Sequence, residues 1–178
     1  MQPKSFPLAD VYRLLEPGPV VMVTTAQGGK QNVMTMAWLT PLEFEPPLVG
    51  CVISENNYSF KALTETGECV IAIPTVVLAE TAVAVGNCSG RNTDKFQKFN
   101  LTALPATDVQ APLIGECFAN LECKVVDSAL VKKYNFFVLE VVKAWTDPAQ
   151  ENPRTFHHRG GNDFAVDGEI IRIPSKMK

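Results

Sequence analysis

Two β-rich segments joined by a Gly28-Gly29 turn restrict the fold of this chain more than any other feature. Residues 20–25 are mostly β-branched, and residues 32–38 follow shortly after the glycines. Adjacent glycines accept the positive φ angles of a tight turn, so the sequence predicts an antiparallel hairpin here.

The second segment of this hairpin carries polar side chains where a buried strand should have none. Asn32 and Trp38 have the same parity, so on a regular strand they project to one face. Met34 and Met36 lie between them, and Thr35 points the other way. An amide and an indole on an otherwise apolar strand suit a flat heteroaromatic ligand. A core strand with satisfied polar ends explains the same residues.

Length and charge limit the class of protein. A chain of 178 residues predicts a single domain over residues 1–178. The net charge of -3 and the lack of a long basic run argue against nucleic acid or an anionic membrane as the main partner. The longest apolar runs are too short to cross a bilayer. With no signal peptide visible at the start, a cytoplasmic location is expected.

The cysteines and histidines show no metal-binding or disulfide pattern. The five cysteines are odd in number and contain no Cys-x-x-Cys pair. Cys51, Cys69 and Cys123 lie in apolar runs, where a thiol is usually buried and inert. Cys88 has polar neighbours, which leaves a redox role open. His157 and His158 are adjacent, so they would face opposite ways on a regular element, and we expect no metal site.

A second polar stretch, residues 54–59, joins a strand to a helix. The continuous apolar run at residues 48–54 is typical of a central strand covered on both faces. Residues 60–66 favour a helix that stops at Gly67. Hydroxyls and amides beside the free N–H groups of a helix start make a natural phosphate site. Ordinary N-capping by Asn57 or Ser59 is the alternative.

Other elements follow from local patterns. Helical spacing predicts a helix at the N-terminus with Ser5 as its N-cap. Arg91 and Lys95, in and after a Ser-Gly-Arg loop, would neutralise a phosphate, although a solvated loop explains them equally well. The last stretch, residues 156–168, is rich in turn residues and has little to pack. Further helices are expected at 76–85 and 94–99, and strands at 69–73, 119–127, 136–144 and 170–173.

Taken in order, these features resemble the flavin reductase-like family of FMN-binding split barrels and, within it, the flavoredoxins. The resemblance covers nearly the whole chain. Its most specific pieces are residues 32–38 and the Asp94-Lys95-Phe96 triplet, which fit the family in order and spacing. The resemblance implies a mainly β fold with flanking helices, namely a six-stranded antiparallel split β-barrel. It also implies a homodimer that holds FMN near the subunit interface.

Carried over residue by residue, the family pattern assigns a set of cofactor-binding residues. Asn32, Thr35 and Trp38 would lie along the isoalloxazine ring. The ribityl phosphate end would be held by Ser54, Asn56 and Ser59, with Lys95 or Arg91 supplying positive charge. Tyr134 and Phe164 match secondary flavin contacts. Relatives place a histidine near Tyr134 and this chain does not, which puts proton delivery there in doubt.

The resemblance implies a flavoprotein oxidoreductase. Either NADH or NADPH would reduce the flavin, or a redox protein such as a ferredoxin-like donor would, with a monooxygenase as a further partner class. The chain shows no catalytic triad, no paired carboxylates and no Gly-x-Gly-x-x-Gly fingerprint. The alternative is a non-enzymatic flavin- or haem-binding split-barrel protein, with His157 and His158 as axial haem ligands.

Overall fold

The computed structural model describes residues 3–174. The strands are β1 (Lys4–Ser5), β2 (Val21–Gln27), β3 (Lys30–Met36), β4 (Leu39–Phe44), β5 (Pro47–Val52), β6 (Glu68–Ile73), β7 (Ala103–Leu104), β8 (Leu113–Ile114), β9 (Ala119–Asp127), β10 (Phe136–Thr146), β11 (Phe156–Gly160) and β12 (Asp163–Val166). The α-helices are α1 (Tyr12–Leu15), α2 (Tyr58–Thr66), α3 (Ala79–Gly86), α4 (Lys95–Lys98) and α5 (Val131–Tyr134). Across residues 3–174, no helix combines the length and apolar character that a membrane crossing requires.

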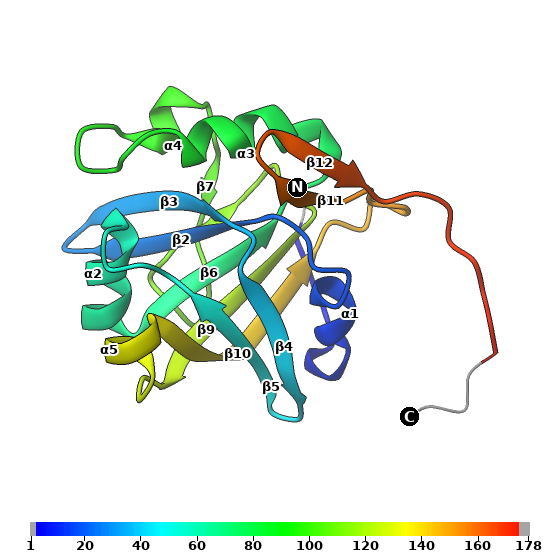
Figure 1. Ribbon diagram of the computed structural model, residues 1–178, viewed down its shortest axis with the longest axis horizontal. Helices are drawn as coiled ribbons and strands as arrows, with labels where there is room; N and C mark the ends of the chain where they lie inside the picture. The colour runs from blue at the N-terminus through cyan, green and yellow to red at the C-terminus, as the bar shows by residue number, and fades with distance from the viewer. Residues whose placement is uncertain (1–2, 175–178) are drawn as a thin grey trace.

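One antiparallel sheet forms the body of the molecule. Its strand order is β3-β2-β6-β9-β10-β5-β4, with β1 paired to β10. The two end strands, β3 and β4, are consecutive in the chain, so the sheet curls into an open barrel (Figure 1). This confirms the mainly β split-barrel class. The sheet has eight described strands, whereas six were expected, because β1 and β4 extend it.

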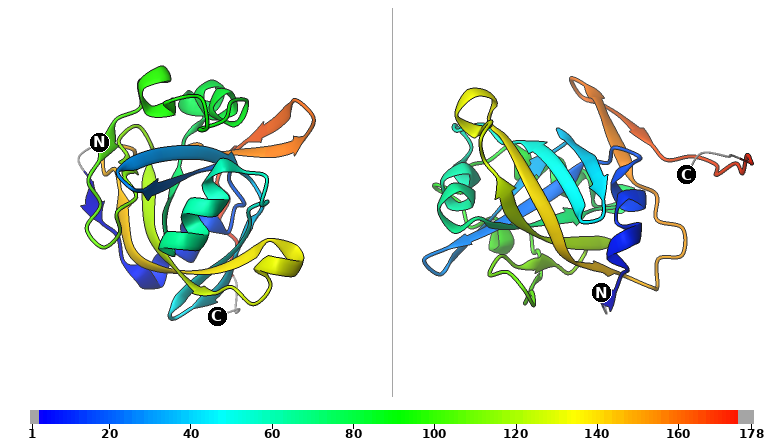
Figure 2. Two further views of the ribbon diagram at one scale, coloured as in Figure 1. Left: turned by 90° about the vertical axis from the view of Figure 1, so that its left-hand side faces the viewer. Right: turned by 90° about the horizontal axis from the view of Figure 1, so that it is seen from below.

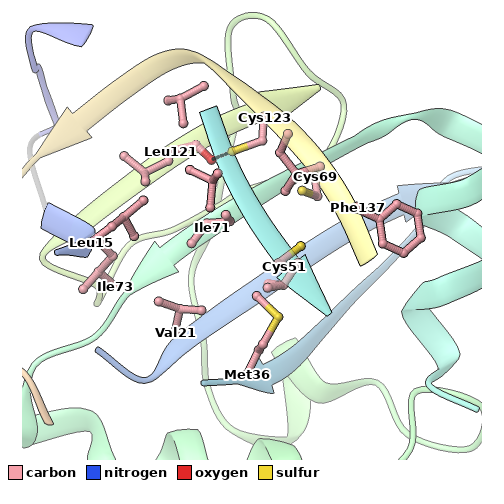
Figure 3. Close-up of a cluster of buried hydrophobic side chains, with 14 of the residues drawn as sticks. Leu15, Val21, Met36, Cys51, Cys69, Ile71, Ile73, Leu121, Cys123 and Phe137 are labelled. Carbon is pink, nitrogen blue, oxygen red and sulfur yellow. Dashed lines mark hydrogen bonds between the residues drawn. The ribbon is translucent and has the colours of Figure 1, made fainter. Parts of the chain in front are cut away.

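Side chains from six strands meet inside the barrel (Figure 3). Those drawn from β2, β3, β5, β6, β9 and β10 include Val21, Met36, Cys51, Ile71, Leu121 and Phe137. Helix α2 contributes Leu63 to the same core, and in the left view of Figure 2 this helix lies in front of the barrel. The six expected strands are therefore the ones that enclose the main core.

A second core lies between the sheet and α3. Successive side chains of a strand point to opposite faces, so Val21 and Val23 of β2 enter the barrel while Met22 packs outside it. There Met22 meets Ala82 and Val85 of α3. Burial on both faces explains why β2 is almost continuously apolar.

The hairpin prediction is confirmed, since β2 and β3 pair across Gly28 and Gly29, both of which have positive φ. The helix predicted over residues 5–15 is confirmed for residues 8–15, where a 3₁₀ helix (Leu8–Asp10) leads into α1, and is wrong at its start. Ser5 does not cap a helix but pairs with Trp145 in the sheet, and the following Phe6 N–H donates to the Ala144 carbonyl at 2.7 Å. The α-helix is only Tyr12–Leu15. Pairing with a distant strand overrides the local helical spacing here.

The predicted central position of the 48–54 strand is also wrong. This strand, β5, lies between β10 and the end strand β4, while β6 and β9 occupy the middle of the sheet. A continuous apolar run indicates that both faces of a strand are buried. It does not indicate the position of that strand in the order of the sheet. The sequence patterns missed β4 itself, because Pro41 interrupts it and most of its residues are exposed.

The C-terminal part departs from expectation twice. Residues 156–168 were expected to pack little, yet β11 and β12 form a hairpin whose first residue, Phe156, is fully buried in the second core. The predicted strand at 170–173 is absent from the described structure. Those residues extend away from the barrel, with Ile170, Ile171 and Ile173 more than two-thirds exposed (Figure 1).

Candidate functional site

Strand β3 and the start of α2 bring predicted site residues together. The Asn32 side-chain amide donates to the Ser59 hydroxyl at 2.8 Å, and the Thr25 hydroxyl lies 3.4 Å from the same oxygen. Ser59 is fully buried in the first turn of α2. Asn32 is only 5% exposed. Two strands and a helix therefore place an amide and two hydroxyls in one polar cluster.

A hollow of about 320 Å³ lies over this cluster. Three cations line it, Lys30, Lys61 and Arg91, with Glu55 as the opposing charge. Asn57 occupies the N-cap of α2 in an extended conformation without a side-chain capping bond. The Phe60 N–H donates to the Asn57 carbonyl at 3.1 Å, which leaves the N–H groups of Tyr58 and Ser59 for a ligand. Cations, hydroxyls and a helix start form a donor set that suits a phosphate.

Gly90 lets the loop between α3 and α4 approach this cluster. A Cβ atom at position 90 would lie 2.1 Å from Asn32 Oδ1 and 2.7 Å from Tyr58 Cδ1. These distances are far below van der Waals contact, so a side chain would displace the loop. The loop carries Arg91 to the rim of the hollow, and Gly90 thus controls where that cation lies.

Thr35 and Lys95 have a common role in this structure, which is to fix α3. The Thr35 hydroxyl donates to the Ala82 carbonyl, and Lys95 Nζ donates to the Val85 carbonyl at 2.9 Å. Lys95 is only 5% exposed. Burial lowers the pKa of Lys95, an effect that the nearby Cys88 thiol partly opposes. Both predicted residues lie against α3, away from the hollow over Ser59.

The end of β5 gathers a second group of predicted residues. The Val52 N–H donates to the Trp38 carbonyl at 3.1 Å, and the Ile53 N–H donates to the Asn135 carbonyl at 3.0 Å. Trp38 and the turn that carries Tyr134 therefore flank the residue that follows, Ser54. Trp38 and Tyr134 are 71% and 55% exposed. Two aromatic faces thus stand open to solvent beside the loop that leads to α2.

The prediction that Asn32, Met34, Met36 and Trp38 project to one face of the strand holds only in part. Met34 and Met36 both pack into the barrel core, as expected. The strand ends at Met36, however, so Trp38 lies beyond it and its exposure does not follow from strand alternation.

Asn56 and Phe164 occupy different places. The exposed Asn56 belongs to the 54–59 loop, where its backbone N–H donates to the Ser54 hydroxyl at 3.2 Å. Phe164 lies on β12 and packs against Phe156 and His158, with ring centroids 5.8 Å and 5.2 Å apart. Within one chain, Phe164 therefore contacts its own hairpin and is not joined to the hollow.

The two histidines already have partners. His157 Nδ1 lies 3.0 Å from the Gly18 carbonyl, and its Nε2 lies 2.6 Å from Asp167 Oδ1. His158 Nε2 lies 3.2 Å from the Gly161 carbonyl. This arrangement does not favour axial haem ligation by the pair.

Sequence reasoning missed four residues of this site: Thr25, Lys30, Lys61 and Gly90. Lys30 follows the Gly28-Gly29 turn, and that position beside a hairpin turn was the one local signal for it. The roles of Thr25 and Gly90 depend on contacts between distant segments, which local patterns do not contain.

The barrel, the helices packed against β3 and the polar hollow at the start of α2 together define a split-barrel protein of the flavin reductase-like class. Direct comparison agrees. The family model described as Flavin reductase like domain matches residues 13–164. The chain belongs to this family.

Solved structures share the fold. An FMN-binding domain of a flavin reductase-like enzyme from Shewanella baltica is 28% identical, with a TM-score of 0.89, over 97% of this chain and 98% of that one. The flavoredoxin of Desulfovibrio vulgaris (Miyazaki F) has a TM-score of 0.81 at 24% identity, over 89% of this chain and 91% of its own. The second likeness supports the fold alone.

Curated relatives are similar over much of the chain. The uncharacterized protein YddH of Escherichia coli K12 is 31% identical over 173 residues, covering 89% of this chain and 92% of its own length. An uncharacterized protein of Archaeoglobus fulgidus is 39% identical over 113 residues, which is 64% of this chain and 64% of that protein.

Proposed function

We propose that this protein binds FMN and acts as an FMN-dependent oxidoreductase, either as an NAD(P)H-dependent flavin reductase or as a flavoredoxin-like electron carrier. The observation that carries the proposal is the 28% identity, over 97% of the chain, to the Shewanella baltica protein described as FMN-binding. The polar hollow over Ser59 supports it independently, because its donors suit the phosphate of a mononucleotide.

Two groups of residues would contact opposite ends of the cofactor. Asn32, Ser59 and Arg91 would hold the phosphate end, with Ser54 and Asn56 beside them. The ring would lie toward Trp38, with Tyr134 as a further aromatic contact. Thr35 and Lys95 would act by fixing α3 and the loop that follows it. When bound, FMN supplies electron transfer in one- or two-electron steps, and the chain supplies orientation and charge.

The proposal includes a homodimer and a cytoplasmic location. Trp38 and Phe164 are both exposed aromatic residues. A two-fold pair would let Phe164 of one copy reach the flavin of the other. All five cysteines are free and four are buried, as expected for a chain kept in a reducing compartment.

The first test is the identity of the cofactor. The purified protein, reconstituted with a mixture of FMN and FAD, should retain FMN as shown by its visible spectrum and by mass spectrometry of the released flavin. The cations and hydroxyls of the hollow gather around one site, as a single terminal phosphate requires. Recovery mainly of FAD, or a Soret band, would overturn the proposal.

The second test separates reductase from carrier. The FMN-loaded protein is mixed anaerobically with NADH, with NADPH or with a reduced ferredoxin, and loss of flavin absorbance is followed by stopped flow. Rapid bleaching by a nicotinamide supports the reductase. Slow bleaching by both nicotinamides with rapid bleaching by ferredoxin supports the carrier.

A matched pair of variants in α2 tests the hollow. Ser59→Ala removes the hydroxyl that accepts from Asn32, and we expect FMN affinity to fall about tenfold, as for loss of one to two polar contacts. Thr64→Ala removes an exposed hydroxyl from the same helix and should leave affinity unchanged. Equal affinities for the two variants would remove Ser59 from the site.

Lys95 is tested against Lys98, an exposed lysine of the same helix. Lys95→Ala should weaken FMN binding about tenfold to a hundredfold, because it removes a buried charge-assisted hydrogen bond that fixes α3. Lys98→Ala should have no effect. If the Lys95 variant binds FMN normally, Arg91 becomes the cation to test.

A further inference from the structure

The last described residues form an arm that leaves the body of the molecule. After Asp167, whose N–H donates to the Thr155 carbonyl, no backbone hydrogen bond holds residues 168–174. The arm projects outward in both figures that show the whole chain (Figures 1 and 2). Its first residues, 168–170, line a hollow with Phe6, Arg13 and Leu14 of the same chain, and the residues after them extend outward.

The arm is unusually apolar for an exposed segment. Ile170, Ile171 and Ile173 are 77%, 72% and 75% exposed. β-Branched residues in this density are typical of a strand, and the extended backbone has no neighbour to pair with in this chain. Contiguous exposed apolar residues commonly mark a contact surface. The arm therefore lacks a strand partner that a second molecule would provide.

An open surface that fits such a strand lies where β4 meets α1. There, a hollow of about 300 Å³ is lined by Tyr12, Leu42 and Phe44, among others. Leu42 and Phe44 are 45% and 54% exposed, and Phe44 packs edge-on against Tyr12 with centroids 4.7 Å apart. Because β4 is the end of the strand path, its outer backbone edge has no partner among residues 3–174.

The charges of the two surfaces are complementary. Arg172 stands between the exposed Ile171 and Ile173. Glu16 and Glu43 line the hollow between α1 and β4. An extended arm would place Ile171 and Ile173 on the apolar side chains of the hollow, with Ile170 and Arg172 on its other face and Arg172 directed toward the carboxylates at the rim. The free backbone edge and the two carboxylates together favour this hollow for the arm.

We propose that the arm, residues 169–174, of one copy docks on the α1–β4 hollow of a second copy as an added strand, and that the second copy returns the same contact. Strand addition to a free sheet edge gains backbone hydrogen bonds and buries alternate side chains. A reciprocal exchange closes with two-fold symmetry. This inference rests on the homodimer proposed above and assigns the segment that holds it together.

Cysteine crosslinking tests the geometry. Leu42→Cys and Ile171→Cys are made separately in a Cys88→Ser background, which removes the half-buried native thiol. The two proteins are mixed and oxidised. We expect a disulfide-linked dimer in the mixture and none with either protein alone. A variant with both cysteines in one chain is also oxidised. If it forms the disulfide within a monomer, or if either single variant alone crosslinks as much as the mixture, the exchange of arms between two copies is wrong.

A charge exchange tests the energetics. Arg172→Glu and Glu43→Lys should each raise the dimer dissociation constant about tenfold in sedimentation experiments, since each contact occurs twice. The double variant should recover much of the loss. Arg159→Glu, the same change at an exposed site on β11, is the control and should have no effect.

Flavin affinity, measured in parallel by titration, keeps this inference separate from the proposed function. If neither the charge exchange nor removal of residues 169–178 changes the dimer dissociation constant, the docking of the arm is wrong. The proposal that the protein binds FMN would then still stand on its own tests. A wild-type monomer would overturn both the arm and the proposed homodimer.

Discussion

At the scale of single residues, Cys88 differs from the other four cysteines, which are buried. Burial raises the pKa of the Cys51 and Cys117 thiols, so they remain protonated and unreactive. Cys88 is only partly buried, and its sulfur lies 3.8 Å from the Val85 carbonyl that also accepts from Lys95. The structure thus leaves one thiol within reach of solvent.

We therefore expect the folded protein to react with one equivalent of a thiol reagent and the denatured protein to react with five. Cys88→Ser should abolish labelling of the folded protein and lower the number of thiols labelled in the denatured protein by one. Rapid labelling of a second thiol in the folded state would contradict the buried positions of the others.

Gly90 gives the second prediction at this scale. Gly90→Ala would place a methyl group 2.1 Å from Asn32 Oδ1, so the loop that carries Arg91 must move. We expect FMN affinity to fall at least tenfold and stability to fall by about 1–3 kcal/mol, as for overpacking. Titration and urea unfolding measure the two effects. Gly168→Ala is the control, because nothing lies within 4 Å of its added Cβ.

At the scale of elements, one buried carboxylate holds a long loop on the sheet. Glu122 of β9 is fully buried, and its two oxygens accept from the N–H groups of Thr107, Asp108 and Val109 and from Trp145 Nε1. Four donors satisfy the charge. The segment between β7 and β8 is thus anchored mainly by this side chain, with further bonds from the Gln110 N–H to Glu68 and from the Thr24 hydroxyl to the Pro112 carbonyl.

Glu122→Gln should lower the free energy of unfolding by about 2–4 kcal/mol, since an amide N–H₂ would face buried donors. Urea unfolding followed by tryptophan fluorescence measures the loss. Glu116→Gln, an exposed carboxylate that accepts from Thr102, should cost far less. Similar losses for the two variants would contradict a special role for burial.

The β11–β12 hairpin is held by an ionic contact with a pH dependence. Burial raises the pKa of Asp167, but hydrogen bonds from Thr155 and His157 outweigh it and hold the pKa below the ordinary value of 3.8. Both ring nitrogens of His157 face acceptors, the Gly18 carbonyl and Asp167 Oδ1.

Because the folded-state pKa of Asp167 is depressed, its contribution to stability is present above the unfolded value and is lost as pH falls through the folded one. The difference in unfolding free energy between wild type and Asp167→Asn should therefore be larger at pH 5 to 6 than below about pH 3, where carboxylates become protonated. Urea unfolding across this range measures it. Asp163→Asn, on the same hairpin, is the control, and an unchanged difference would contradict the contact.

At the scale of the whole molecule, the proposed cofactor should stabilise the fold by mass action. Free FMN at a hundred times its dissociation constant adds about 2.7 kcal/mol, which for a chain of this size raises the Tm by about 5–11 °C. Thermal unfolding of a flavin-free sample with added FMN measures the shift. Riboflavin lacks the phosphate and should give a clearly smaller shift at equal concentration. Equal shifts would contradict a phosphate site over Ser59.

The sequence by itself determined the features that depend on local chemistry. Gly28 and Gly29 specify the first hairpin, because only glycine adopts their positive φ angles without strain. Runs of β-branched and other apolar residues specify strands β2, β6, β9 and β10, and the order of polar stretches pointed to the flavin reductase-like family. These features need no knowledge of distant segments.

Only the tertiary structure decided which distant residues meet. Asn32 and Ser59 bond across 27 positions of sequence, and Thr35 is tied to Ala82 rather than to the hollow. Sheet pairing placed Ser5, the predicted N-cap, in β1, and burial of Phe156 organised a hairpin from a glycine-rich segment. Such contacts follow from how the sheet closes, a long-range event whose energy is not contained in any local pattern of residues.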